Sequence, residues 1–226
     1  MTAGLADALR HGTHALHREV ERSACMQCLL RGQMPQPAYA LLLRNLHHLY
    51  VGLEAALSRH QAHPLLAPLH DPKLWRSNAL ELDLAFLHGP DWPSALPLMA
   101  ATAAYGQRLQ QLADGRPALL VAHAYVRYLG DLSGGQQLKR IVARSLGLPA
   151  GAQGTAFYDF GDAEKTALLT ASFRGRLAGL DVDEPDLGAI VAEAQDAFGR
   201  HGALFEELAL ATGLAPVPAP SGLTTS

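Results

Sequence analysis

The middle of the chain reads Ala122-His-Ala-Tyr-Val-Arg-Tyr-Leu-Gly-Asp-Leu-Ser-Gly-Gly-Gln136, an apolar and aromatic run that ends in a cluster of glycines. Apolar residues on both sides of it recur with α-helical spacing, so the sequence predicts one helix with Gly130, Gly134 and Gly135 inside it. Each glycine inside a helix costs about 1 kcal/mol relative to alanine. Two explanations stay open here. Either the helix bends at this point, or a flat ligand lies against a backbone that has no Cβ atoms.

The same helical spacing extends over nearly the whole chain, with prolines and glycines between the segments. Helices are predicted over residues 5–32, 37–63, 71–89, 94–114, 117–146, 163–180 and 185–212. Asp71-Pro72 is expected to begin the third, with the aspartate as its N-cap. No segment shows strand periodicity, and no repeat or linker divides the chain. We therefore expect an all-α fold with a single domain over residues 1–214 and a disordered Pro/Ser/Thr tail over residues 215–226.

The bulk composition narrows the function. Of the 226 residues, 49% are hydrophobic and 17% are charged, which is enough apolar material for one buried core. The formal net charge of -3 offers no basic surface to nucleic acid. No apolar run reaches the roughly 18 residues that span a bilayer, and the N-terminus lacks the apolar core of a signal peptide. We expect a cytoplasmic protein with no membrane or nucleic-acid partner, whose Cys25 and Cys28 are buried or half-buried thiols.

One of the 11 histidines differs from the rest. His17 precedes Glu21 by four residues, which places both side chains on one face of the first predicted helix. A carboxylate in this position can hold one ring nitrogen of a histidine while the other nitrogen binds a metal, and haem iron commonly takes one such histidine. By itself the pair is more typical of an exposed ion pair, so its role stays open. The sequence contains no Glu-x-x-His or His-Glu-x-x-His motif for a di-iron or zinc site.

Taken together, these features resemble the haem oxygenase family. The run from His123 to Gly135 is similar to the family's signature along nearly its whole length, and the segment from Leu9 to Glu21 is similar to its proximal helix. Similarity extends over about residues 5–210. The resemblance implies a haem oxygenase-like helical bundle, with haem b between a proximal helix and a kinked, glycine-rich distal helix. It also implies an enzyme that uses dioxygen and electrons to convert haem into biliverdin, carbon monoxide and ferrous iron.

The resemblance assigns roles to individual residues. It implies that His17 is the axial ligand of the haem iron, with Glu21 supporting it. Asp131, Arg127 and Tyr50 are implied as the catalytic residues of the distal side. The other residues implied to bind haem are Arg10, Tyr125, Gly130, Gly134, Arg174, Phe198 and Phe205. Electrons are expected from an external donor, either a ferredoxin, a flavodoxin or an NADPH-dependent reductase, and a biliverdin-using photoreceptor is a candidate downstream partner.

Three positions depart from the family's pattern. His14 and Thr170 stand where well-known members carry lysines that bind the haem propionates, and His201 stands in place of a polar amide. The propionates are therefore expected to rest mainly on Arg10 and Arg174. Because the propionate contacts set which meso carbon faces the oxygen, and Arg174 is retained, we expect opening at the α position and biliverdin IXα as the product.

Three alternatives stay open on the sequence alone. The first is a haem carrier of the same fold without activity, which Asp131 argues against because binding alone needs no distal carboxylate. The second is a helical interaction module without haem, in which His17 and Glu21 form a surface pair. The third is a thiaminase-like helical enzyme with a cysteine nucleophile, for which neither Cys25 nor Cys28 has a visible acid-base partner.

Overall fold

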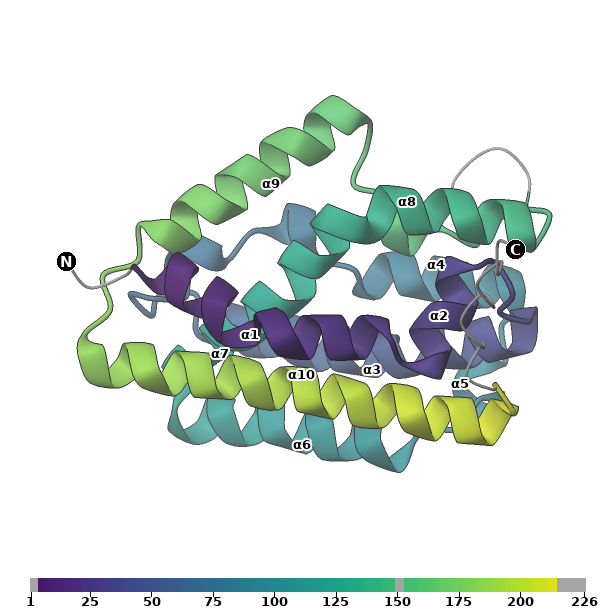
Figure 1. Cartoon of the computed structure of the whole chain (residues 1–226), viewed down its shortest axis with the longest axis horizontal. Helices are drawn as coiled ribbons and strands as arrows, with labels where there is room; N and C mark the ends of the chain where they lie inside the picture. The colour runs from purple at the N-terminus through teal and green to yellow at the C-terminus, as the bar shows by residue number, and fades with distance from the viewer. Residues whose placement is uncertain (1–3, 149–152, 215–226) are drawn as a thin grey trace, which may run out of the picture.

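The computed structural model describes residues 4–148 and 153–214 as a bundle of helices (Figure 1). These residues contain no β-strand, so the all-α prediction is confirmed. The α-helices are α1 (Leu5–Glu21), α2 (Ala24–Leu30), α3 (Gln36–Arg59), α4 (Ser77–Leu87), α5 (Trp92–Ala95), α6 (Ala100–Gly115), α7 (Leu120–Ala124), α8 (Gly130–Ser145), α9 (Ala163–Ala178) and α10 (Glu184–Thr212). The predicted tail, residues 215–226, lies outside the described residues.

The long helices pack in pairs around a core of leucine, alanine and a few large aromatic side chains. α1 lies along α10, and α3 packs against both α4 and α6. In Figure 1, α8 and α9 run along the upper side of the molecule, and α10 and α6 run along the lower side. Tyr50, Tyr105, Tyr128 and Phe173 are among the largest side chains that are fully buried. This core holds α1 and α8 as the two walls of the site described below.

α1 packs closely against α10 at Gly12. A Cβ atom at this position would lie 2.6 Å from Val191 Cγ1. Gln195 Nε2 also donates a hydrogen bond to the Gly12 carbonyl over 2.9 Å. The missing side chain therefore sets how deeply α1 packs. Further along the same pair of helices, the ring of His17 meets the ring of Phe198 edge-on, with 5.9 Å between their centroids.

The first helix predicted over residues 5–32 is wrong in its extent. α1 ends at Glu21 and α2 begins at Ala24, where Ser23 is the N-cap and its hydroxyl accepts a hydrogen bond from Met26 N. A serine in this position satisfies a backbone N–H that has no partner inside its own helix. The chain can therefore start a new helix at low cost, and the apolar spacing alone does not reveal the break.

α2 carries the two cysteines, and both are free and buried, as expected. Burial, and to a lesser degree the neighbouring Cys28, raises the pKa of Cys25 to about 12. Burial also raises the pKa of Cys28. Because the thiolate is the nucleophilic form of cysteine, these thiols are poor nucleophiles at neutral pH. This counts against the alternative of an enzyme with a catalytic cysteine.

The helix predicted over residues 71–89 begins later than expected. Asp71 does act as an N-cap, but the element it begins is the short 3-10 turn Pro72–Leu74. α4 begins only at Ser77, where the Glu54 carboxylate from α3 accepts the backbone N–H of Ser77 over 3.2 Å. A carboxylate from another helix thus replaces a local cap, and a reading of local sequence has no means of finding it.

The helix predicted over residues 94–114 is divided into α5 and α6. Leu96 has an extended backbone, because a residue that precedes proline, here Pro97, is disfavoured in the helical region. The other long helices end within a few residues of their predicted bounds: 37–63 against Gln36–Arg59, 163–180 against Ala163–Ala178, and 185–212 against Glu184–Thr212.

The distal helix predicted over residues 117–146 is interrupted, but not at its glycines. A π-helical turn over Tyr125–Leu129 joins α7 to α8. Gly130, Gly134 and Gly135 follow this turn inside α8, and none of them has a positive φ. The irregularity therefore lies one turn earlier than expected. π turns inside helices occur frequently at functional sites, and the glycines need a different explanation from a bend.

Candidate functional site

A cavity of about 820 Å³ lies between α1 and α8, and α2, α3, α9 and α10 close its other sides. Its volume falls within the range of about 300–1,000 Å³ that is usual for small-molecule sites. All the residues that the sequence assigned to ligand contact line it, together with two of the three assigned catalytic residues: Arg10, His17, Glu21, Tyr125, Arg127, Gly130, Asp131, Gly134, Arg174, Phe198 and Phe205. Tyr50 is the exception, because it is fully buried behind the wall.

The α1 wall presents His17 and Glu21. Their side chains are 53% and 51% exposed, and 3.7 Å separates His17 Nδ1 from Glu21 Oε2. This distance is too long for a direct hydrogen bond. The carboxylate lies on the Nδ1 side of the ring. Nε2 makes no hydrogen bond to any residue that the structure describes, so His17 can offer it to a ligand.

The α8 wall presents bare backbone. A Cβ atom added to Gly130 or Gly134 would meet nothing within 4 Å, and both residues line the cavity. Gly135 differs, because a Cβ there would lie 3.4 Å from the carbonyl oxygen of Tyr158. Of the two explanations left open by the sequence, the absence of Cβ atoms therefore fits Gly130 and Gly134: they leave a smooth wall against which a flat ligand can lie.

The three residues assigned to catalysis form one hydrogen-bonded cluster beside the glycines. Arg127 donates to the hydroxyl oxygen of Tyr50 from Nε over 3.0 Å and from Nη2 over 2.8 Å. Tyr50 in turn donates its hydroxyl proton to Asp131 Oδ2 in a short hydrogen bond. Arg127 Nη2 also reaches Asp131 Oδ1 at 3.3 Å. Tyr50 therefore holds the carboxylate from behind, while Arg127 and Asp131 face the cavity.

Burial controls the protonation of this cluster. It raises the pKa of Asp131, while the charge of Arg127 and the hydroxyl of Tyr50 oppose the rise. Burial also raises the pKa of Tyr50 well above its ordinary value. Tyr50 is therefore a neutral phenol at physiological pH. It can donate its proton to Asp131 and accept from Arg127 at the same time.

His201 on α10 completes the cluster, although the sequence analysis did not include it among the site residues. Arg127 Nη1 donates to His201 Nε2, so the ring carries its proton on Nδ1, which is buried without a partner among the described residues. Burial, and then the nearby charge of Arg127, lower the pKa of His201 well below its ordinary value. His201 lies on one helix face with Phe198 and Phe205, and that spacing was the available signal.

A second buried polar chain lies behind His201. The ring of Tyr105 meets that of His201 edge-on, with 6.0 Å between centroids, and its hydroxyl lies 3.0 Å from His123 Nδ1. His123 Nε2 lies 3.0 Å from Glu193 Oε1, and Arg108 forms an ion pair with Glu193 at 2.5 Å. Burial alone would raise the pKa of Glu193, but the hydrogen bonds from His123 and Arg108 lower it to about 2. Glu193 is thus an anion that fixes the ring of His123.

Two cations stand at the mouth of the cavity. Arg10 on α1 and Arg174 on α9 are both exposed, and both line it. Among the described residues Arg10 pairs with Asp7, at 3.4 Å, and the two side chains are 69% and 63% exposed. Such pairs contribute at most about 1 kcal/mol. A ligand carboxylate can therefore replace Asp7. Tyr125 connects the two walls, since its hydroxyl lies 3.3 Å from Thr13 Oγ1 on α1.

Known proteins are similar in sequence to this chain along most of its length. The family model described as heme oxygenase matches residues 3–207. The chain is 39% identical to heme oxygenase 1 of Bos taurus over 209 residues, which covers 92% of this chain and 72% of that protein. It is 38% identical to heme oxygenase 1 of a Nostoc species over 208 residues, which covers 92% of this chain and 87% of that protein.

Solved structures share the arrangement of helices. The crystal structure of heme oxygenase-1 from a Synechocystis species in complex with heme is 38% identical in sequence, with a TM-score of 0.86 over 93% of this chain and 96% of that one. Heme oxygenase-2 from the same organism, in complex with heme and NO, is 37% identical, with a TM-score of 0.87 over 91% of this chain and 85% of that one.

Proposed function

The chain belongs to the haem oxygenase family, and we propose that its cavity holds haem between His17 on α1 and the glycines of α8 while dioxygen opens the porphyrin. The reaction of the family consumes haem, dioxygen and electrons, and it yields biliverdin, carbon monoxide and ferrous iron. One observation carries the proposal: a wall without Cβ atoms at Gly130 and Gly134 and the exposed His17 line the same cavity. A helical interaction module would need neither feature.

In this proposal His17 would bind the haem iron through Nε2. The position of Glu21 on the Nδ1 side of the ring supports this choice, because a carboxylate at one imidazole nitrogen orients the other and makes it more basic. His201 also lines the cavity, but its Nε2 accepts a hydrogen bond from Arg127. His17 is therefore the histidine of the described cavity lining whose Nε2 has no protein partner.

The remaining contacts follow from the chemistry of a porphyrin. A flat apolar ring fits against bare backbone and aromatic side chains, and its two propionates need cations at the mouth of the cavity. We assign the ring faces and edges to Gly130, Gly134, Tyr125, Phe198 and Phe205, and the propionates to Arg10 and Arg174. Opening at the α-meso carbon remains a prediction that rests on Arg174.

On the distal side, Asp131, Tyr50 and Arg127 would determine where protons are held. Bound haem supplies the redox-active iron and the ring that is consumed. Tyr50 and Arg127 occupy one lone pair on each oxygen of Asp131; the lone pairs that remain can hold an ordered water at the cavity wall. Because the pKa of His201 is lowered, it is neutral at pH 7. The distal side therefore offers a water held by a carboxylate rather than a strong acid.

Haem oxygenases draw their electrons from an external reductase. We propose a ferredoxin, a flavodoxin or an NADPH-dependent reductase as the donor here, with dioxygen as the oxidant, and a biliverdin-using photoreceptor as a downstream consumer. Among the described residues, no helix combines the length and the apolar character that a membrane span requires. The cytoplasmic location stays a prediction.

The test is a titration of the protein with haem, followed by ascorbate in air. The proposal predicts a Soret band that saturates at about one equivalent of haem and then decays into the broad red absorption of biliverdin. A Soret band that persists with ascorbate and also with a ferredoxin and its reductase would favour the haem carrier. The absence of any Soret band would show that the cavity does not bind haem, which would contradict the proposal.

A further inference from the structure

The loop between α8 and α9 forms part of the cavity wall. Residues 155–161, named here the strap, contain the short 3-10 turn Ala156–Tyr158. Two consecutive side chains of the strap, Phe157 and Tyr158, line the cavity and are almost fully buried. Because a loop has no regular hydrogen-bond ladder of its own, its buried backbone groups need partners elsewhere.

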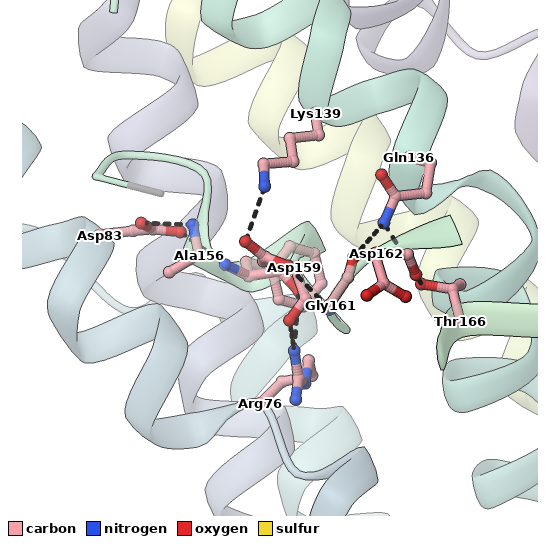
Figure 2. Close-up of polar contacts among 10 residues, drawn as sticks. Arg76, Asp83, Gln136, Lys139, Ala156, Asp159, Gly161, Asp162 and Thr166 are labelled. Carbon is pink, nitrogen blue, oxygen red and sulfur yellow. Dashed lines mark hydrogen bonds and ion pairs between the residues drawn. The ribbon is translucent and has the colours of Figure 1, made fainter. Parts of the chain in front are cut away.

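Asp83 on α4 supplies the partners for the start of the strap. Its two carboxylate oxygens accept the backbone N–H groups of Ala156 and Phe157, each over 2.8 Å, and Figure 2 shows the Asp83 carboxylate facing the Ala156 nitrogen. Asp83 itself has no exposed surface. A charged carboxylate is costly to bury, so its presence here indicates a specific task, and the two N–H groups define that task.

Other side chains fix the end of the strap. Arg76 Nη1 donates to the carbonyl of Asp159 over 2.9 Å, and Lys139 of α8 pairs with the Asp159 carboxylate at 2.7 Å (Figure 2). Gln136 of α8 donates to the carbonyl of Gly161 over 3.3 Å. The strap is thus held between the α4 region on one side and α8, the glycine helix that carries Gly130, Gly134 and Gly135, on the other.

The strap in turn touches the catalytic cluster. The ring of Phe157 meets the ring of Tyr50 edge-on, with 5.6 Å between their centroids, and Tyr50 donates to Asp131. The backbone of Tyr158 lies against Gly135, where a Cβ would be 3.4 Å from its carbonyl oxygen. A shift of the strap would therefore move the ring that supports Tyr50 and loosen the contact that seats α8.

We propose that Asp83 is a positioning residue for the distal wall: by holding the N–H groups of Ala156 and Phe157, it fixes the strap that supports Tyr50 and the glycine helix. Its effect on the reaction rests on the proposed role of Asp131, whereas its effect on the strap does not. Asp83 touches neither the cavity nor Asp131 and acts through the Phe157 ring.

The chain offers a matched control for Asp83. The carboxylate of Glu207 on α10 also accepts two backbone N–H groups, those of Ala100 and Ala101, over 3.0 and 2.7 Å. None of these three residues lines the cavity. Burial raises the pKa of Asp83 to about 6, so the comparison is made at pH 7.5, where the Asp83 carboxylate is ionised.

The first measurement is hydrogen–deuterium exchange of the strap in the protein without haem. Asp83→Asn replaces one acceptor with an NH₂ group that faces a backbone N–H, so we expect exchange at Ala156 and Phe157 to become about tenfold faster. Glu207→Gln should speed exchange only near Ala100 and Ala101. Unchanged exchange of the strap in Asp83→Asn would overturn the proposal, whatever the protein does with haem.

The second measurement separates binding from turnover. With haem bound, Asp83→Asn should slow ring opening by about tenfold and change the dissociation constant for haem by less than about twofold. Phe157→Leu removes the phenyl ring that packs against Tyr50 and keeps Asp83. It should slow the opening of the porphyrin by a similar factor. A loosened strap with wild-type ring opening would overturn the proposal. If Asp83→Asn does not fold, Phe157→Leu decides, and a wild-type rate for it overturns the proposal too.

Discussion

The two walls of the cavity differ in how far the fold fixes the orientation of their functional side chains. On α1, His17 and Glu21 are about half exposed and stand 3.7 Å apart. On the α8 side, Arg127 and Asp131 are 12% and 9% exposed, and both are bonded to Tyr50. Among the described residues, the side chains of His17 and Glu21 have no close hydrogen-bond partner that orients them, whereas the groups of the α8 wall are oriented by hydrogen bonds to Tyr50. Preorganised polar groups of the second kind are what transition-state stabilisation requires.

The largest effect is expected on the α1 wall from His17→Ala. The variant would lose the proposed iron ligand while the apolar cavity remains, so haem should bind at least about 100-fold more weakly and yield no detectable biliverdin. Absorption titration measures the affinity. His11→Ala is the matched control, since His11 lies on the same helix, is exposed and does not line the cavity. A wild-type Soret band and turnover in His17→Ala would contradict the assignment.

The α8 wall should respond in rate rather than in affinity. Tyr50→Phe removes the hydroxyl that joins Arg127 to Asp131, so biliverdin formation should slow by about 10- to 100-fold while haem affinity changes less than about twofold. Tyr128→Phe removes a buried hydroxyl that has no partner among the described residues and should change the rate less than about twofold. Equal behaviour of the two variants would show that the hydroxyl of Tyr50 has no special role.

The buried His201 of α10, next to Arg127, predicts a pH dependence. The folded-state pKa of His201 is lowered, so the unfolded chain binds the extra proton, and the free energy of unfolding falls as the pH drops below about 6.5. Each such histidine contributes up to about 1.4 kcal/mol per pH unit. Urea denaturation between pH 6.5 and 5 should show a shallower fall for His201→Gln. The exposed His14 supplies the control, and the same slope in His201→Gln and His14→Gln would contradict the prediction.

The smallest effect is expected from Gly134→Ala. It tests whether this glycine leaves space for a ligand or only lowers the stability of the helix. Gly134→Ala adds a Cβ that meets nothing, so the protein without haem should gain about 0.5–1 kcal/mol in its free energy of unfolding, while haem affinity falls. Gly188→Ala, in an exposed position of α10 outside the cavity lining, should bring the same gain with no loss of affinity. Unchanged haem affinity in Gly134→Ala would show that this glycine does not face the ligand.

The sequence predicts well those helices whose apolar residues recur with the helical period. The apolar spacing gives the long helices such as α3 and α10 to within a few residues, because their burial follows the helical period. It fails where a single polar side chain, local or from another helix, caps the start of a new helix. Ser23 starts α2 and the Glu54 carboxylate starts α4, and neither contact interrupts the apolar pattern.

The same division holds for the site. Of the twelve residues to which the resemblance gave a role, eleven line the cavity in the structure, and Tyr50 is buried behind the cavity wall. The resemblance noted His201 only as a departure from the family's pattern and gave no role to Asp83. Both make contacts between distant segments: His201 meets Arg127, and Asp83 meets the strap. The spacing along α10 places His201 on the face of Phe198 and Phe205, but the partner through which His201 or Asp83 acts is revealed only by the packing.

We propose that Asp131 on the α8 wall holds an ordered water on the distal side, and that this water is needed for biliverdin to form. The most direct measurement is the biliverdin yield of Asp131→Ala in a single turnover of the stoichiometric haem complex, compared with the wild-type chain. The account predicts a Soret band and haem affinity close to those of the wild type, with the biliverdin yield lower by at least about tenfold. A full yield of biliverdin from Asp131→Ala would contradict it.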